Sequence, residues 1–75
     1  MSRLPRVTGD QLVAALRLAG FTVARIRGSH HFLCHPDARR TVVPVHSGET
    51  IGPGLLSKIL RDCKLDVEAA RYLLR

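Results

Sequence analysis

The sequence predicts a small α+β domain in which a helix, three antiparallel strands, a second helix and a short third helix follow one another. Three observations predict this order. Apolar residues recur at helical spacing near the start of the chain. Three short segments typical of strands follow, with turn residues between them. A proline then opens an amphipathic segment after position 52. A chain of 75 residues has room for one domain, over residues 1–75, with a small core.

The first helix is predicted from its two ends and from the spacing between them. Thr8 and Gln11 stand three residues apart, as the N-cap and N3 positions of a capping box require. Leu12 and Leu16 then lie one turn apart on the same face of the helix. Gly20 supplies the left-handed residue at which helices commonly end. We therefore expect a helix of about three turns between Thr8 and Gly20.

Three strands are expected, at residues 21–27, 30–35 and 41–46. The first segment is rich enough in β-branched and aromatic residues for a strand. Gly28-Ser29 separates the first two strands, and a Pro-Asp turn at residues 36–39 separates the last two. Because parallel strands would need crossovers of about a dozen residues, these short connections predict an antiparallel sheet. Pro44 cannot donate a hydrogen bond to a ladder, which predicts that the third strand lies at an edge of the sheet.

The second helix begins at Gly52-Pro53, since proline is favoured at the first helical position. Its predicted buried stripe consists of Leu56, Ile59, Leu60 and Cys63. Asp66 is a suitable N-cap for the short third helix. The order α-β-β-β-α, with helices on one face of a three-stranded sheet, is that of the double-stranded-RNA-binding domain, which reads RNA by its shape and backbone.

The charge of the chain points to a polyanionic partner. Twelve Lys and Arg residues against six Asp and Glu give a net charge of +6 at neutral pH, and the isoelectric point is about 10.7. Such an imbalance in a small domain indicates nucleic acid, an anionic membrane or an acidic protein as the partner. The basic residues are almost all Arg, whose guanidinium suits bidentate contacts to phosphate.

A membrane partner finds no support in the sequence. The longest apolar run, residues 12–16, is too short to span a bilayer, and no helix combines a wide apolar face with a basic one. The N-terminal stretch does not resemble a secretion signal, so we expect a cytoplasmic protein whose Cys34 and Cys63 are free thiols. Phe21 and Phe32 are expected in the core, which leaves little aromatic surface for stacking on bases.

The sequence predicts neither a metal site nor a cofactor. His31 and His35 lie four residues apart on a strand, hence on one face, but a zinc site needs at least one more ligand and Cys34 points to the other face. Metal-dependent nucleases gather carboxylates around their ion. The six Asp and Glu residues are scattered along the chain and form no such cluster.

Five short motifs occur in order along residues 8–68. They are Gly20-Phe21, Gly28-Ser29-His30-His31, His35-Pro36-Asp37, Val43-Pro44-Val45-His46-Ser47-Gly48 and Leu56-Ser57-Lys58-Ile59-Leu60-Arg61. Each motif is weak by itself, but five at this spacing are specific. Together they closely resemble the pattern of the HicA (YcfA-like) toxin family. A basic extension at residues 3–6 precedes the first helix, and the resemblance assigns no role to it.

The resemblance implies a toxin of a type II toxin–antitoxin system, namely an mRNA interferase that cleaves RNA and is inhibited by a HicB-type antitoxin. In that family the catalytic histidine directly follows Gly-Ser or Gly-Gly at the start of the second strand. His30 occupies this position here. His31 occupies a position at which the family does not require histidine, so the resemblance implies no catalytic role for it.

The residues around His30 suit the chemistry of RNA cleavage without a metal. RNA carries its own nucleophile, the 2′-hydroxyl, so cleavage needs a base for that proton, an acid for the departing 5′-oxygen and cations for the growing negative charge. Histidine can serve as either base or acid near neutral pH. The candidate RNA-binding residues are Gly28, Ser29, Arg25, Arg27, Lys58 and Arg61. His46 is a candidate second active-site group.

Simpler interpretations remain open. His30 also suits a surface or capping position, His46 a structural hydrogen bond at a strand end, and Arg39-Arg40 a solvated turn. The alternative functions are a noncatalytic RNA-binding module of the double-stranded-RNA-binding type and an interaction protein whose basic face binds an acidic partner. The Gly28-Ser29-His30 motif favours the ribonuclease, because binding alone needs no histidine at that place.

Overall fold

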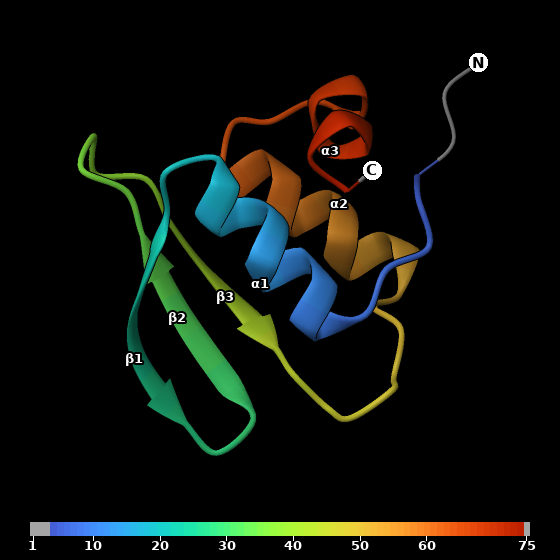
Figure 1. Ribbon diagram of the computed structural model, residues 1–75, viewed down its shortest axis with the longest axis horizontal. Helices are drawn as coiled ribbons and strands as arrows, with labels where there is room; N and C mark the ends of the chain where they lie inside the picture. The colour runs from blue at the N-terminus through green and yellow to red at the C-terminus, as the bar shows by residue number, and fades with distance from the viewer. Residues whose placement is uncertain (1–3, 75) are drawn as a thin grey trace.

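The computed structural model describes residues 4–74 and consists of a three-stranded sheet with three helices on one of its faces (Figure 1). The elements are α1 (Gly9–Leu18), β1 (Thr22–Arg27), β2 (His30–Cys34), β3 (Arg40–Pro44), α2 (Pro53–Asp62) and α3 (Val67–Leu73). The sheet is antiparallel with the strand order β1-β2-β3. The predicted α+β fold, α-β-β-β-α with an additional C-terminal helix, is confirmed, and it is consistent with a double-stranded-RNA-binding-like domain. Residue 3 of the basic extension lies outside the described residues.

The first helix begins with the predicted capping box. The backbone N–H of Gln11 donates to the Thr8 hydroxyl at 3.2 Å, and the backbone N–H of Thr8 donates to the Gln11 side chain at 2.9 Å. The helix ends before Gly20, whose φ of +99° is the left-handed conformation that glycine adopts without strain. Local sequence signals therefore set both ends of α1.

The first residue of α1 packs directly against the end of β3. A Cβ atom added at Gly9 would lie 2.9 Å from the Cα of Val45 and closer still to the carbonyl oxygen of Pro44. Such distances are shorter than ordinary carbon contacts. Gly9 is therefore the residue that allows the helix layer to touch the sheet at this point.

The third strand is shorter than predicted. It ends at Pro44, so that Val45 and His46 lie in the loop that leads to α2. One further hydrogen bond, from the Val45 N–H to the Ser29 carbonyl at 2.7 Å, continues the pairing past the end of the strand. The predicted edge position of β3 is confirmed.

The core lies between the helices and one face of the sheet. It consists of Val7, Leu12, Leu16, Phe21, Leu33, Val43, Ile51, Leu56, Ile59, Leu60, Cys63 and Ala70. The predicted stripe of α2 is buried as expected. Neither cysteine forms a disulfide. Burial raises the pKa of the Cys63 thiol to about 11, so this thiol stays protonated at neutral pH.

The first strand contains a β-bulge that the sequence did not reveal. Val23 pairs with Leu33, whereas Arg25 pairs with Phe32 and Arg27 with His30, so Ala24 is an extra residue in the ladder. Val23 packs against the core like its partner. After the bulge the alternation is reversed, and Arg25 and Arg27 point away from the helices.

The prediction that Phe32 belongs to the core is wrong. Successive residues of a strand point to opposite faces, and Leu33, the next residue along, is the one that is buried against the helices. Phe32 therefore lies on the other face and is only partly buried. The guanidinium of Arg25 lies over its ring, 4.8 Å from the centroid.

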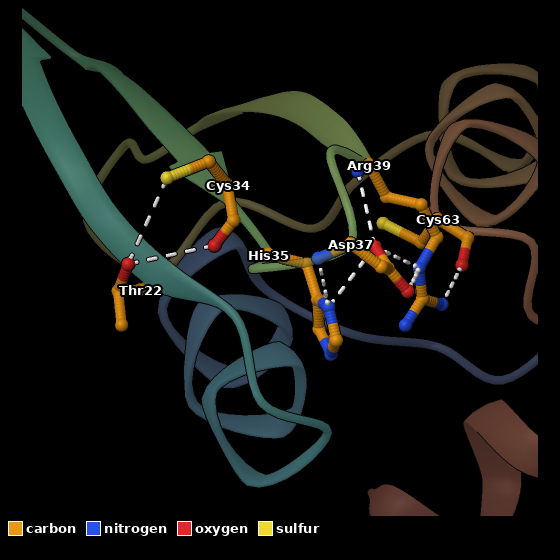
Figure 2. Close-up of polar contacts among 6 residues, drawn as sticks. All are labelled: Thr22, Cys34, His35, Asp37, Arg39 and Cys63. Atoms are coloured by element: carbon orange, nitrogen blue, oxygen red, sulfur yellow. Dashed lines mark hydrogen bonds and ion pairs between the residues drawn. The ribbon is translucent and has the colours of Figure 1, made fainter.

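Arg39 is also not the solvated turn residue that was expected. Its Nε donates to the Asp37 carboxylate at 2.9 and 3.0 Å, and its Nη1 donates to the Cys63 carbonyl (Figure 2). Its guanidinium lies 5.0 Å from the centroid of the Phe21 ring. The hydrogen bond from Arg39 lowers the pKa of Asp37, which keeps this carboxylate ionised. Arg39 thus ties the β2–β3 turn to the end of α2, whereas Arg40 remains exposed.

Candidate active site on the open face of the sheet

The face of the sheet that the helices leave uncovered is called here the open face. Its side chains form three cross-strand rows, Arg27–His30–Pro44, Arg25–Phe32–Val42 and Thr22–Cys34–Arg40. Among the residues that the structure describes, no Asp or Glu lies in a strand. The open face therefore combines an apolar floor with three arginines and a histidine.

His30 is the first residue of β2 and is exposed on the open face. Gly28 precedes it in a two-residue turn and has a φ of +56°, which accounts for glycine at this point of the hairpin. No atom lies within 4 Å of a Cβ added at Gly28, so this stretch of backbone is open to an approaching ligand. Arg27 is the cross-strand partner of His30, at a spacing of about 5 Å between Cβ atoms.

His30 and His31 face opposite sides of the sheet. His31 pairs with Val43, a core residue, and is partly buried on the helix side. Its Nδ1 is buried, and no hydrogen-bond partner for it exists within residues 4–74. In the same range no side chain forms a hydrogen bond or ion pair with His30. The imidazole of His30 is therefore accessible to a substrate, whereas that of His31 is not presented to the open face.

A shallow groove of about 810 Å³ runs over the open face and past the edge of β3. Its lining includes Arg25, Phe32, Arg40, Val42, Lys58 and Asp62. Lys58 donates to the Asp62 carboxylate at 3.0 Å, and this hydrogen bond lowers the pKa of Asp62. Since the carboxylate stays ionised at neutral pH, it offsets the charge of Lys58. The uncompensated positive charge of the groove resides on Arg25 and Arg40.

The structure brings together most of the predicted site residues, but not all of them. Arg25, Arg27 and His30 share the open face, and Lys58 lines the groove from α2. Arg61 is exposed on α2, where it donates to the Ser57 hydroxyl at 3.2 Å, and it does not line the groove. The lining of the groove includes neither Arg61 nor His30, and the assignment of Arg61 to RNA binding stays a prediction.

His46 lies close to the turn that precedes His30 but outside the sheet. It follows Val45, whose N–H bonds to Ser29, and its own carbonyl accepts from the Glu49 N–H at 3.0 Å. The His46 side chain is exposed. In the part of the chain that is described, no hydrogen bond joins His46 to His30. His46 therefore lies near the turn before His30, and its role as a second active-site group stays a prediction.

Two residues of the open face were missed from the sequence, Phe32 and Arg40. Phe32 could have been identified from alternation, since the argument that directs Cys34 away from His31 applies equally to Phe32. Arg40 lay outside the predicted third strand, which begins one residue earlier than expected. Arg40 pairs with Cys34 and shares its face. The bulge at Ala24, by contrast, left no local signal.

Neither a metal cluster nor a membrane span is found within residues 4–74. No group of three or more His, Cys, Asp and Glu side chains there is arranged to hold an ion. His35, which was considered as a ligand together with His31, packs edge-on against Phe21 at 5.0 Å between ring centroids. In the same range, every helix is too short or too polar for a bilayer crossing.

Comparison with known proteins agrees with the resemblance noted in the sequence. No curated protein shows significant similarity to the chain. The sequence profile of a family described as HicA toxin of bacterial toxin–antitoxin matches residues 9–65. This stretch begins at the first residue of α1, contains the whole sheet and α2, and ends before α3. It therefore covers well over half of the chain, including His30 and every other residue of the open face. The chain belongs to the HicA toxin family of bacterial toxin–antitoxin systems.

Proposed function

We propose that this toxin is an mRNA interferase of a type II system, a metal-independent endoribonuclease with His30 as its catalytic residue. One observation carries the proposal. An accessible imidazole stands on a cationic face, directly after a glycine turn that leaves the backbone open. A proton-transfer group beside phosphate-binding cations is what cleavage by an internal nucleophile requires.

In the proposed reaction His30 removes the proton of a ribose 2′-hydroxyl. The 2′-oxygen then forms a bond to the adjacent phosphorus, and the bond between phosphorus and the 5′-oxygen breaks. The products are a 2′,3′-cyclic phosphate and a 5′-hydroxyl. The nucleophile comes from the RNA itself, so the reaction needs neither a water molecule nor a metal ion to supply it. Arg27 and Arg25 stabilise the charge that grows on the phosphoryl oxygens, and Gly28 and Ser29 accommodate the phosphate. His46 is the proposed donor of the proton that the leaving 5′-oxygen takes up.

The proposal predicts that cleavage needs a single 2′-hydroxyl and no divalent ion. The test uses an RNA oligonucleotide with one mapped cleavage position, and a matched oligonucleotide with 2′-deoxyribose at that position only. The first substrate should be cut at an unchanged rate in excess chelator and leave a 2′,3′-cyclic phosphate end. The second should not be cut at that position, because its nucleophile is missing.

Three results would contradict this mechanism. Loss of cleavage in chelator, with recovery on adding a divalent ion, would replace it with a metal-dependent reaction. Cutting of the 2′-deoxy position would mean that water, not the ribose, attacks the phosphorus. A protein that binds both substrates equally and cuts neither would instead be the noncatalytic RNA-binding module.

Membership of a toxin–antitoxin family implies an antitoxin partner. We propose that this partner is an acidic HicB-type protein that covers the open face and so blocks His30. The net charge of +6 would attract an anionic protein and speed its association. Purification from the native cells should recover the chain with a small acidic protein that suppresses RNA cleavage. Recovery of the chain bound to nucleic acid alone would argue against such a partner.

A further inference from the structure

The open face carries a partly buried aromatic ring and an exposed guanidinium that lie in contact outside the core. Phe32 points away from the helices, and Arg25 lies over it at 4.8 Å. Both residues line the groove on the open face. Phe32 is only partly buried on this face, whereas Phe21 is fully buried in the core. The pair therefore invites an explanation in terms of a ligand.

The pair also lies one step from the proposed catalytic residue. Phe32 follows His30 by two residues on the same strand and face, which corresponds to about 6.6 Å along β2. A single nucleotide can span such a step. Arg40 lies one row further along the same face. An RNA strand that passes His30 in the direction of β2 would therefore reach Arg25 and then Arg40.

We propose, on the basis of the proposed ribonuclease function, that Arg25 and Phe32 form a stacking platform for the nucleobase next to the cleaved phosphate. In this platform the Phe32 ring supports the Arg25 guanidinium from the side of the sheet, and the base stacks on the side of the guanidinium that faces solvent. Bases of unpaired RNA stack in this way on aromatic rings and on Arg guanidinium planes, whereas the faces of paired bases are covered by their neighbours. The substrate is therefore unpaired RNA, although the fold resembles a domain that binds duplexes.

The test measures whether the platform and the base act on each other. The binding constants of the His30→Ala protein are determined for an RNA with one mapped cleavage position and for RNAs that lack the base on either side of it. Removal of the stacked base should weaken binding about 5- to 100-fold. In proteins that also carry Phe32→Leu or Arg25→Lys, the same removal should change binding less than about 2-fold, because the interaction is already lost.

The variants separate stacking from charge and from folding. Arg25→Lys keeps the positive charge but lacks the planar guanidinium, so a normal dependence on the base in this variant would overturn the platform. Phe32→Leu keeps an apolar side chain, and Phe32→Trp should retain the dependence on the base. Tyr72→Ala removes an exposed aromatic ring from α3 and should change nothing. Melting curves verify that each variant is folded.

Failure of this inference can be distinguished from failure of the ribonuclease proposal. Equal effects of base removal with and without the platform would overturn the platform, while cleavage by the wild-type protein would still stand. Conversely, coupling between the base and the platform in a protein that never cleaves RNA would overturn the ribonuclease and leave the platform as an RNA-binding site.

Discussion

Replacement of His30 by alanine should lower the rate of RNA cleavage by about 10²–10⁴-fold or more, the usual contribution of a general acid–base group. The loss of stability should be small, since substitutions at exposed positions are usually within about 0.5 kcal/mol. His30 is exposed, and within residues 4–74 its side chain has no hydrogen-bond partner to lose. The two effects are measured on one preparation, as single-turnover cleavage and as a melting curve.

His31→Ala is the matched control, because it removes the same side chain from the neighbouring position on the opposite face. The His31→Ala protein should keep most of the activity. Because His31 is partly buried, a modest loss of stability is expected from this substitution. Normal cleavage by the folded His30→Ala protein would show that His30 is not the catalytic residue. An unfolded His30→Ala protein would identify His30 as a structural residue.

The second large effect is expected in stability, at Gly9. In Gly9→Ala the new methyl group would meet the backbone of Pro44 and Val45, which cannot move aside as a flexible side chain would. Overpacking of this kind costs about 1–3 kcal/mol, and the upper end applies here because the contact is with main-chain atoms. A domain of 75 residues has a total stability of about 4–11 kcal/mol. The midpoint of urea unfolding should therefore fall markedly.

Gly54→Ala provides the control for this substitution. Gly54 also lies in the first turn of a helix, but no atom is within 4 Å of a Cβ added there. Alanine is the better helix former by up to about 1 kcal/mol, so this variant should unfold at the same or a higher urea concentration. Equal destabilisation by both substitutions would mean that the close approach at Gly9 is not the cause.

The elements of the fold were predictable because their signals are local. The capping box at Thr8 and Gln11, the glycine at position 20 and the proline at position 53 each mark a helix end within a few residues. The antiparallel sheet followed from the shortness of the loops. The end of β3 was predicted two residues too late, because an apolar residue after Pro44 looks like strand in sequence.

The candidate site was predictable only in part. His30 and the glycine turn came from a motif, and the geometry agrees with their exposure. Phe32 was assigned to the core because phenylalanine is usually buried, although alternation with Leu33 argued otherwise. The role of Arg39 depends on a carbonyl 24 residues away, at Cys63, and no local pattern reports such a contact.

The bulge at Ala24 changes which face of the sheet the later residues of β1 occupy. Counted in the ordinary way, Val23, Arg25 and Arg27 are all odd-numbered and would share one face, which would press two guanidinium groups against the helices. One additional residue shifts the alternation, so Val23 at the start of β1 packs against the core while Arg25 and Arg27 near its end point to the open face. In related chains, a gain or loss of one residue between these positions would exchange the two surfaces of the strand. Length here is therefore as consequential as the identity of any side chain.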